Sequence, residues 1–189
     1  MTDLIAISEL NDFMFCPYSI YLHNIYEETD GDFYKAMPQT RGSIAHRNIE
    51  HKTASTRSSC IMSLPVMSER LGVYGKIDMF RQNERTLIER KYKLKRVFQG
   101  QAFQLWAQYF CMTEMGYDVR ALAFYETSAH KTHPIPLPDE QGLKELKSLI
   151  LHFRAFNPAS SVFNVNSNKC AHCIYCNLCD HTDSTNVYT

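Results

Sequence analysis

Apolar side chains recur at helical spacing over three long stretches of the chain, residues 7–28, 99–116 and 139–156. Positions three or four residues apart share one face of a helix, so each stretch is predicted to be a helix with one apolar side. Cys16-Pro17 interrupts the first stretch, which predicts two helices, the second beginning at Pro17. A further helix is expected over residues 40–55, with loops over 29–39 and 53–59.

Between these helices, shorter runs with alternating or β-branched residues predict strands. The runs cover residues 60–67, 73–80, 86–93, 118–126 and 131–137. Pro65, Pro134 and Pro136 place the first and last runs at sheet edges, because proline cannot donate to a central ladder. Residues 82–84 predict a hairpin turn between the second and third runs.

The composition adds limits to this picture. With 189 residues and a mass of 21.9 kDa, the chain is expected to form one domain. Its formal net charge is zero, so any nucleic-acid footprint must be local. No apolar run is long enough to cross a bilayer and the first residues lack a basic secretory start, so we expect a cytoplasmic protein without a membrane partner. Seven cysteines, an odd number, favour metal or redox use over a disulfide framework.

The run at residues 86–93 carries charged side chains directly behind strand-forming ones. Leu87, Glu89 and Lys91 fall on one face, because side chains alternate along a strand, and we expect them on a semi-buried edge. Taken alone, such a pair is more often an ion pair than a metal ligand beside a water-orienting group. Asp78 lies on the preceding run, with ten residues between it and Glu89. Two neighbouring carboxylates repel unless a divalent cation bridges them, and oxygen ligands favour Mg²⁺ or Mn²⁺.

Two features of the helices fit this carboxylate pair. His46 would complete a His/Asp/Glu set around one cation as a neutral imidazole, although a lone histidine on a helix is more often structural. Gln101, Gln104 and Gln108 form a stripe on the helix at residues 99–116. The stripe is either an exposed polar face or a set of hydrogen-bonding groups directed at substrate or metal-bound water.

A basic run directly follows Glu89. It is either a solvated turn or a track for DNA phosphates, and we favour the track because a neutral protein needs a local basic surface to bind DNA. The run comprises Arg90, Lys91, Lys93, Lys95 and Arg96.

Four cysteines within ten residues near the C-terminus indicate a metal site; these are Cys170, Cys173, Cys176 and Cys179. The two pairs are too close together for zinc knuckles, and Asp180 stands where the ferredoxin pattern needs its last cysteine. The remaining interpretation combines Cys170, Cys173 and Cys179 with Cys16. It would clamp both ends of the domain together and leave Cys176 as a spare thiol.

Together these motifs resemble the RecB-type exonucleases of CRISPR adaptation, the family called Cas four, within the PD-(D/E)xK nuclease superfamily. The resemblance runs from Cys16 to Cys179. Besides the four cysteines, it rests on Gly42/His46, Gly75/Asp78, Glu89/Lys91 and Gln104. The chain departs from the family at Gln108, where the usual motif Gln-x-x-x-Tyr has its tyrosine, and in the additional Cys176.

The resemblance implies an α/β fold with a restriction-endonuclease-like core, a mixed sheet flanked by helices. Residues 40–156 would form the nuclease core of the single domain, and residues 1–28 and 157–189 would be joined by a 4Fe–4S cluster. The function implied is a Mg²⁺- or Mn²⁺-dependent DNA nuclease that works beside the Cas one–Cas two integrase, trims prespacers and reads the adjacent motif. Two alternatives stay open: a RecB-like repair nuclease outside CRISPR, and a catalytically idle iron–sulfur DNA-binding scaffold.

The resemblance also implies residue roles. Asp78, Glu89, Lys91 and Gln104 would be catalytic, with His46, Asp78 and Glu89 holding the Mg²⁺ or Mn²⁺ ion. Lys91 would position the attacking water. The iron–sulfur ligands would be Cys16, Cys170, Cys173 and Cys179, and the DNA contacts Arg90, Lys93, Lys95 and Arg96.

Overall fold

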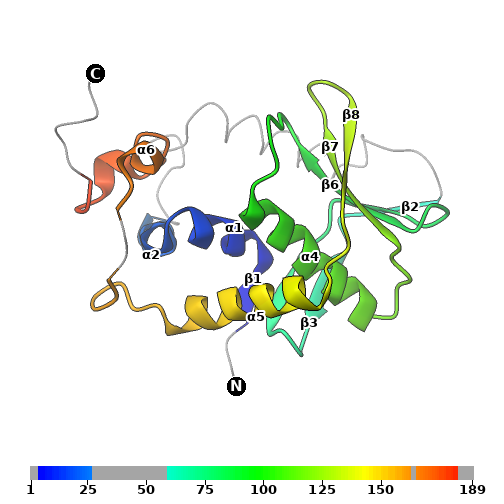
Figure 1. The fold of residues 1–189 in the computed structure, drawn as a ribbon, viewed down its shortest axis with the longest axis horizontal. Helices are drawn as coiled ribbons and strands as arrows, with labels where there is room; N and C mark the ends of the chain where they lie inside the picture. Colours follow the sequence, from blue (N-terminus) through cyan, green and yellow to red (C-terminus); the bar gives the residue numbers. More distant parts are fainter. Residues whose placement is uncertain (1–3, 27–58, 163–164, 183–189) are drawn as a thin grey trace.

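The computed structural model describes residues 4–26, 59–162 and 165–182 (Figure 1). Helices α1 (Ile7–Phe15) and α2 (Pro17–Tyr26) are separated by Cys16 alone, as predicted. Cys16 is extended, with φ −158° and ψ 116°, because a residue before proline avoids helical angles. The expected loop at residues 29–39 and the expected helix at 40–55 lie outside the described residues.

The strands form two mixed sheets. In the first, β4 (Val73–Lys76) lies between β1 (Ile5–Ala6) and β3 (Pro65–Ser68). The second has the order β2 (Cys60–Met62), β5 (Met79–Arg81), β6 (Thr86–Lys91), β7 (Ala121–Glu126) and β8 (Lys131–Ile135). Only β1–β4 and β6–β7 pair in parallel. The edge positions predicted from the prolines are confirmed for β3 and β8.

Two of the predicted strands are wrong in extent, because each is broken at a shared corner. The run at residues 60–67 divides into β2 and β3 around Ser63, whose φ is 53°. The run at 73–80 divides into β4 and β5 around Ile77 and Asp78. Ser63 N donates to Asp78 O at 3.2 Å and Ile77 N donates to Leu64 O at 3.0 Å. The paired strands therefore bend together from one sheet into the other, and Asp78 lies at the bend.

The predicted hairpin after this corner is confirmed. β5 and β6 pair antiparallel, with Phe80 opposite Leu87 and Arg81 opposite Thr86. β6 is a central strand between β5 and β7. The expectation that Glu89 and Lys91 lie on a sheet edge is therefore wrong.

The two remaining long helices, α4 (Gln99–Glu114) and α5 (Glu140–Ala155), match their predicted stretches. At the start of α5 the Asp139 carboxylate accepts a hydrogen bond from Gly142 N at 2.7 Å, an N-cap. Gly100 lets α4 approach α1, since a Cβ there would lie 3.3 Å from the Asn11 Cα. Buried side chains of α1, α4, α5 and the strands form the main core, which includes Leu10, Ile77, Leu87, Leu105, Phe124 and Leu146.

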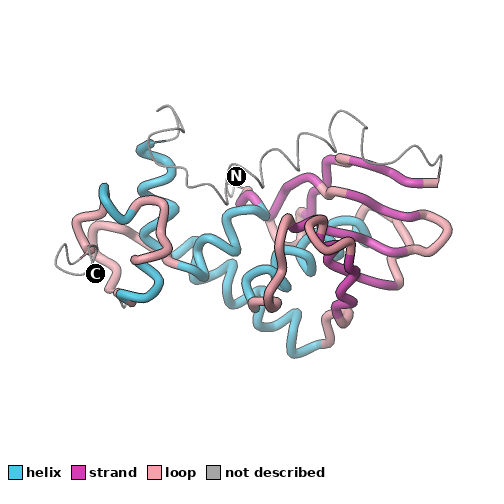
Figure 2. Tube along the Cα trace, turned by 90° about the horizontal axis from the view of Figure 1, so that it is seen from above, coloured by secondary structure: helices cyan, strands magenta, loops and turns pink. Residues whose placement is uncertain are grey.

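The C-terminal segment carries α6 (Ser167–Cys170) and the short 3₁₀ helix η2 (Cys176–Leu178). Seen from above, the strands gather at one end of the molecule and this segment at the other (Figure 2). It packs on α2 through a separate cluster of Tyr18, Leu22 and Tyr175. None of the helices in the described ranges is both long enough and apolar enough to cross a membrane.

Candidate functional site

The corner between the sheets brings the two predicted carboxylates together. Met79 lies opposite Ile88 at the end of the β5–β6 ladder, and Asp78 and Glu89 are the residues directly beyond this pair. Asp78 Oδ2 accepts a hydrogen bond from Arg90 N at 2.7 Å, which fixes the carboxylate against β6. Both side chains are buried, at 6% exposure for Asp78 and 2% for Glu89.

Glu89 is the centre of a hydrogen-bond network between β6 and α4. Lys91 Nζ donates to Glu89 Oε1 at 3.0 Å and Gln104 Nε2 donates to the same oxygen at 3.1 Å. Gln108 Nε2 donates to Glu89 Oε2 at 2.9 Å. A carboxylate offers about four acceptor positions, so three donors leave capacity for a cation.

Of the two interpretations of the glutamine stripe, the exposed polar face is wrong. Gln108 is only 2% exposed and both Gln104 and Gln108 bind Glu89. Gln101 has a different task, because its Oε1 accepts from Phe98 N at 3.0 Å and so caps the start of α4. Gln108 was not among the expected site residues; the signal that marks it is its i, i+4 spacing from Gln104 among apolar neighbours.

His46, the third expected ligand, lies outside the described residues. Among the described residues, no three His, Cys, Asp or Glu side chains are arranged to hold one metal ion. The corner thus contributes two carboxylates, one ammonium group and two amides.

The basic run after Glu89 divides into two parts. Arg90 is half-buried, and its Nε and Nη1 atoms are buried and find no hydrogen-bond partner among the described residues. The side chains of Lys93, Lys95 and Arg96 are exposed. Lys93, Lys95 and Arg96 are therefore the members of the run most accessible to a phosphate backbone.

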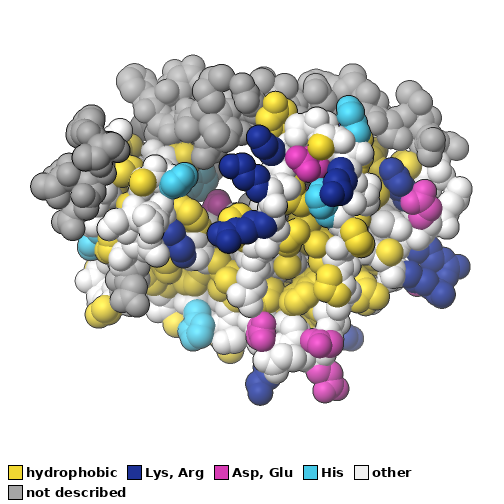
Figure 3. All heavy atoms as spheres, turned by 45° about the horizontal axis from the view of Figure 1, so that its top comes forward, with side chains coloured by type: hydrophobic (Ala, Val, Ile, Leu, Met, Phe, Trp, Pro, Cys, Tyr) yellow, Lys and Arg dark blue, Asp and Glu magenta, His cyan; other side chains and the backbone are white. Residues whose placement is uncertain are grey.

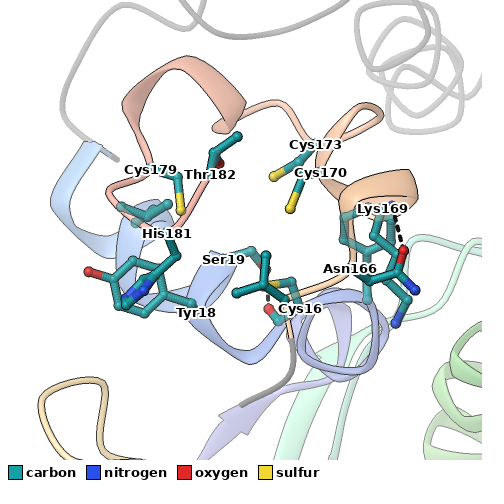
Figure 4. Close-up of a pocket in the computed structure, with 13 residues that line it drawn as sticks. Cys16, Tyr18, Ser19, Asn166, Lys169, Cys170, Cys173, Cys179, His181 and Thr182 are labelled. Atoms are coloured by element: carbon teal, nitrogen blue, oxygen red, sulfur yellow. Dashed lines mark hydrogen bonds between the residues drawn. The ribbon is translucent and has the colours of Figure 1, made fainter. Parts of the chain in front are cut away.

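Four of the cysteines line one small pocket beneath the C-terminal segment: Cys16, Cys170, Cys173 and Cys179. The sulfur atoms of Cys170, Cys173 and Cys179 face the same central space, with Cys16 across it (Figure 4). Cys176 is not part of this lining. The four cysteines that line the pocket are the four that the sequence analysis combined, and Cys176 is the one it set aside.

Burial favours the neutral form of two of the pocket thiols, Cys170 and Cys173. Burial is the main cause that raises the pKa of Cys173 to about 11, and burial also raises the pKa of Cys170. A metal that binds thiolates would displace these protons. Once deprotonated, clustered cysteines are soft donors of the kind that hold zinc or iron–sulfur groups.

Comparisons with known proteins establish similarity of fold. No protein-family model matches the chain, and no curated protein matches it. A crystal structure of a protein called SSO0001 is similar, with a TM-score of 0.65 and 14% sequence identity over 96% of this chain and 87% of that one. At this identity the similarity shows the fold alone: a mixed α/β fold in which helices flank mixed sheets.

Proposed function

We propose that the chain is a Mg²⁺- or Mn²⁺-dependent DNA nuclease with a restriction-endonuclease-like core. The observation that carries the proposal is the corner where Asp78 bonds the Arg90 amide, next to Glu89, and Lys91 bonds Glu89. A purely structural ion pair needs one carboxylate and one ammonium group. The corner adds a second buried carboxylate to that pair, and two neighbouring carboxylates offer the oxygen ligands that a divalent cation of this kind prefers.

Each residue of the corner has a role in this chemistry. Asp78 and Glu89 would hold the ion, with His46 as a further ligand. The ion, when bound, polarises the scissile phosphate and lowers the pKa of a water molecule. Lys91 orients the water and offsets negative charge that develops on the phosphate. Gln104 contacts both Glu89 and Lys91, with Lys91 Nζ 3.5 Å from its Oε1. It thereby holds the carboxylate and the ammonium group in fixed positions relative to each other.

The proposal includes a 4Fe–4S cluster on Cys16, Cys170, Cys173 and Cys179. In a cluster bound by four cysteines each thiolate binds its own iron, so the ligands surround a volume and do not converge on one point. Four cysteines that line one pocket fit that requirement. The cluster would join the α1–α2 junction to the C-terminal segment.

We further propose that the nuclease belongs to the Cas four family and acts in CRISPR adaptation, on prespacer ends beside the Cas one–Cas two integrase. Support comes from the motif order of the sequence, from Gly42/His46 to the C-terminal cysteines. Co-purification with the integrase subunit of the same locus tests this part, and selective trimming of 3′ overhangs only in that complex is the expected result.

The experiment that tests the nuclease itself is a cleavage assay on labelled single-stranded and overhanging DNA with Mn²⁺, after anaerobic purification. Glu89→Gln and Lys91→Ala should each lower the rate at least about 100-fold, the loss typical of metal-site partners. Both should retain most of their DNA affinity, which depends on phosphate contacts. Lys147→Ala on the exposed face of α5 is the control. Wild-type rates in either site variant would refute the assignment, and DNA binding by an inactive wild type would favour the scaffold.

A further inference from the structure

A large groove lies beside the corner, and the cleavage chemistry alone does not explain it. Its volume is about 940 Å³. Its walls come from α1 and α2, from residues 96–101 at the start of α4, and from residues 166–175 of the C-terminal segment. Figure 3 shows Lys and Arg side chains gathered around a hollow on one face of the molecule. The cations that line the groove are Arg96 and Lys169.

Each of these two cations is paired with an aromatic ring. The Arg96 guanidinium lies 4.3 Å from the centroid of the Phe98 ring, and Phe98 is 50% exposed. Lys169 Nζ lies 5.8 Å from the Phe15 ring centroid and donates to Met14 O at 3.2 Å. Cations that follow a phosphate backbone, combined with rings on which bases stack, are the two components of single-strand recognition.

The groove leads toward the carboxylate corner. Gln101 lines it and stands one helical turn before Gln104, which binds Glu89. Asp12 lines it as well, and Lys91 is near enough to act on that carboxyl: burial raises the pKa of Asp12, while Asn11, His23 and Lys91 act in the opposite direction. A strand lying in the groove would therefore pass Gln101, one turn of α4 from the residue that binds Glu89.

We propose that this groove holds a single strand of DNA, with phosphates on Arg96 and Lys169 and a base stacked on Phe98. The inference rests on the proposed function, because that function is what would cleave the bound strand at the Asp78–Glu89 corner. A single strand fits better than a duplex, because the bases of a duplex are stacked on each other and present no free face to Phe98. Asp12 is the carboxylate that faces the phosphates, so it weakens binding and the strand must pass nearer to the two cations.

The test measures DNA binding without cleavage. A fluorescently labelled oligo-dT of about 12 nucleotides, within the usual range of single-strand site sizes, is titrated with protein in a chelating buffer and followed by anisotropy. Phe98→Ala should weaken binding about tenfold, within the range of one stacked base. Arg96→Ala should weaken it and reduce the salt slope by about 0.7. Asp12→Asn should strengthen it.

Matched controls come from α5, which contributes nothing to the groove lining. Leu151→Ala removes a hydrophobic side chain that is 63% exposed, and Lys147→Ala removes an exposed cation. Both should bind DNA as the wild type does. Lys169 is next to Cys170, so Lys169→Ala is compared with Lys169→Arg at equal iron content, and only the alanine variant should lose affinity.

Two results would overturn the inference: Phe98→Ala and Arg96→Ala that bind as tightly as the α5 controls, or a blunt duplex that competes as well as the single strand. These results are independent of the proposed function. If the wild type cuts DNA and the groove variants bind it with unchanged affinity, the nuclease proposal stands and the groove proposal is refuted. If the wild type never cuts DNA but the groove variants lose affinity, the groove proposal stands and the nuclease proposal is refuted.

Discussion

Replacement of Gln108 by leucine tests whether α4 is built to hold Glu89. Gln108 Nε2 donates to Glu89 Oε2 at 2.9 Å, and both side chains are only 2% exposed. Leucine has nearly the same volume, so the substitution removes the hydrogen bond without leaving a large cavity. A hydrogen bond to a charged group contributes about 1.5–3 kcal/mol to stability.

A second effect of the substitution has the opposite sign. Gln108 Oε1 is buried and has no hydrogen-bond partner among the described residues, and leucine removes this unsatisfied oxygen, a gain of about 1 kcal/mol. The net loss for Gln108→Leu is therefore about 0.5–2 kcal/mol. For a chain of this length, that loss lowers Tm by roughly 1–8 °C.

A double-mutant cycle with Glu89→Gln separates the two effects, because the unsatisfied oxygen is removed on both sides of the cycle and cancels. A bond to a neutral amide oxygen is worth about 1 kcal/mol less than a bond to a carboxylate. Urea unfolding of the four proteins, at equal iron content, should thus give a coupling energy of about 1 kcal/mol. Coupling below about 0.3 kcal/mol would mean that Gln108 only fills space, and the positioning role would be refuted.

Two further predictions concern the cysteine pocket and the end of α4. Anaerobic protein should be brown with about four irons per chain; Cys179→Ser should lose colour and iron while Cys176→Ser keeps both, and colourless wild type with stoichiometric zinc would contradict the cluster. Glu114 accepts hydrogen bonds from Ser68 and from the Glu69 and Arg70 amides, and these lower its pKa below the ordinary 4.5. A carboxyl whose pKa is lowered by folding stabilises the folded protein above its unfolded pKa, and this stabilisation is lost as the pH falls through its folded pKa. Glu114→Gln should therefore unfold at a lower urea concentration than wild type at pH 7, and the two proteins should unfold at the same concentration in acid. A difference in urea midpoint that does not change with pH would refute this.

The helices and the hairpin could be predicted from sequence because local chemistry determines them. Pro17 fixes the break between α1 and α2 by its own geometry, and the apolar spacing of α4 and α5 needs no partner to be recognised. The corner at Asp78 is different. The run from Val73 to Phe80 keeps a strand-like pattern throughout, and the bend is imposed by hydrogen bonds to Ser63 and Leu64, more than ten residues away in the sequence.

The pairing of side chains in the candidate site was predictable from the sequence, but their burial was not. Spacing alone places Glu89 and Lys91 on one face of a strand, and their ion pair follows from it. Whether the strand lies at an edge or in the centre depends on β7, which joins β6 only after α4 has crossed. For the same reason the burial of Arg90 Nε and Nη1 could not be predicted from a basic run, since it depends on which face of β6 is covered.

The cysteine pocket and the groove share part of one wall. Phe15, Ser19, Asn166, Lys169 and Cys173 line both. Because Lys169 stands next to Cys170, any group held by the thiols also fixes the position of the Lys169 ammonium above Phe15. The break at Cys16-Pro17 serves both sites, since Cys16 turns into the pocket while Asp12 and Phe15, one turn earlier or less, line the groove. Loss of the group on the cysteines should therefore weaken single-strand binding even though the Asp78–Glu89 corner, which shares no residue with the cysteine pocket, keeps its geometry.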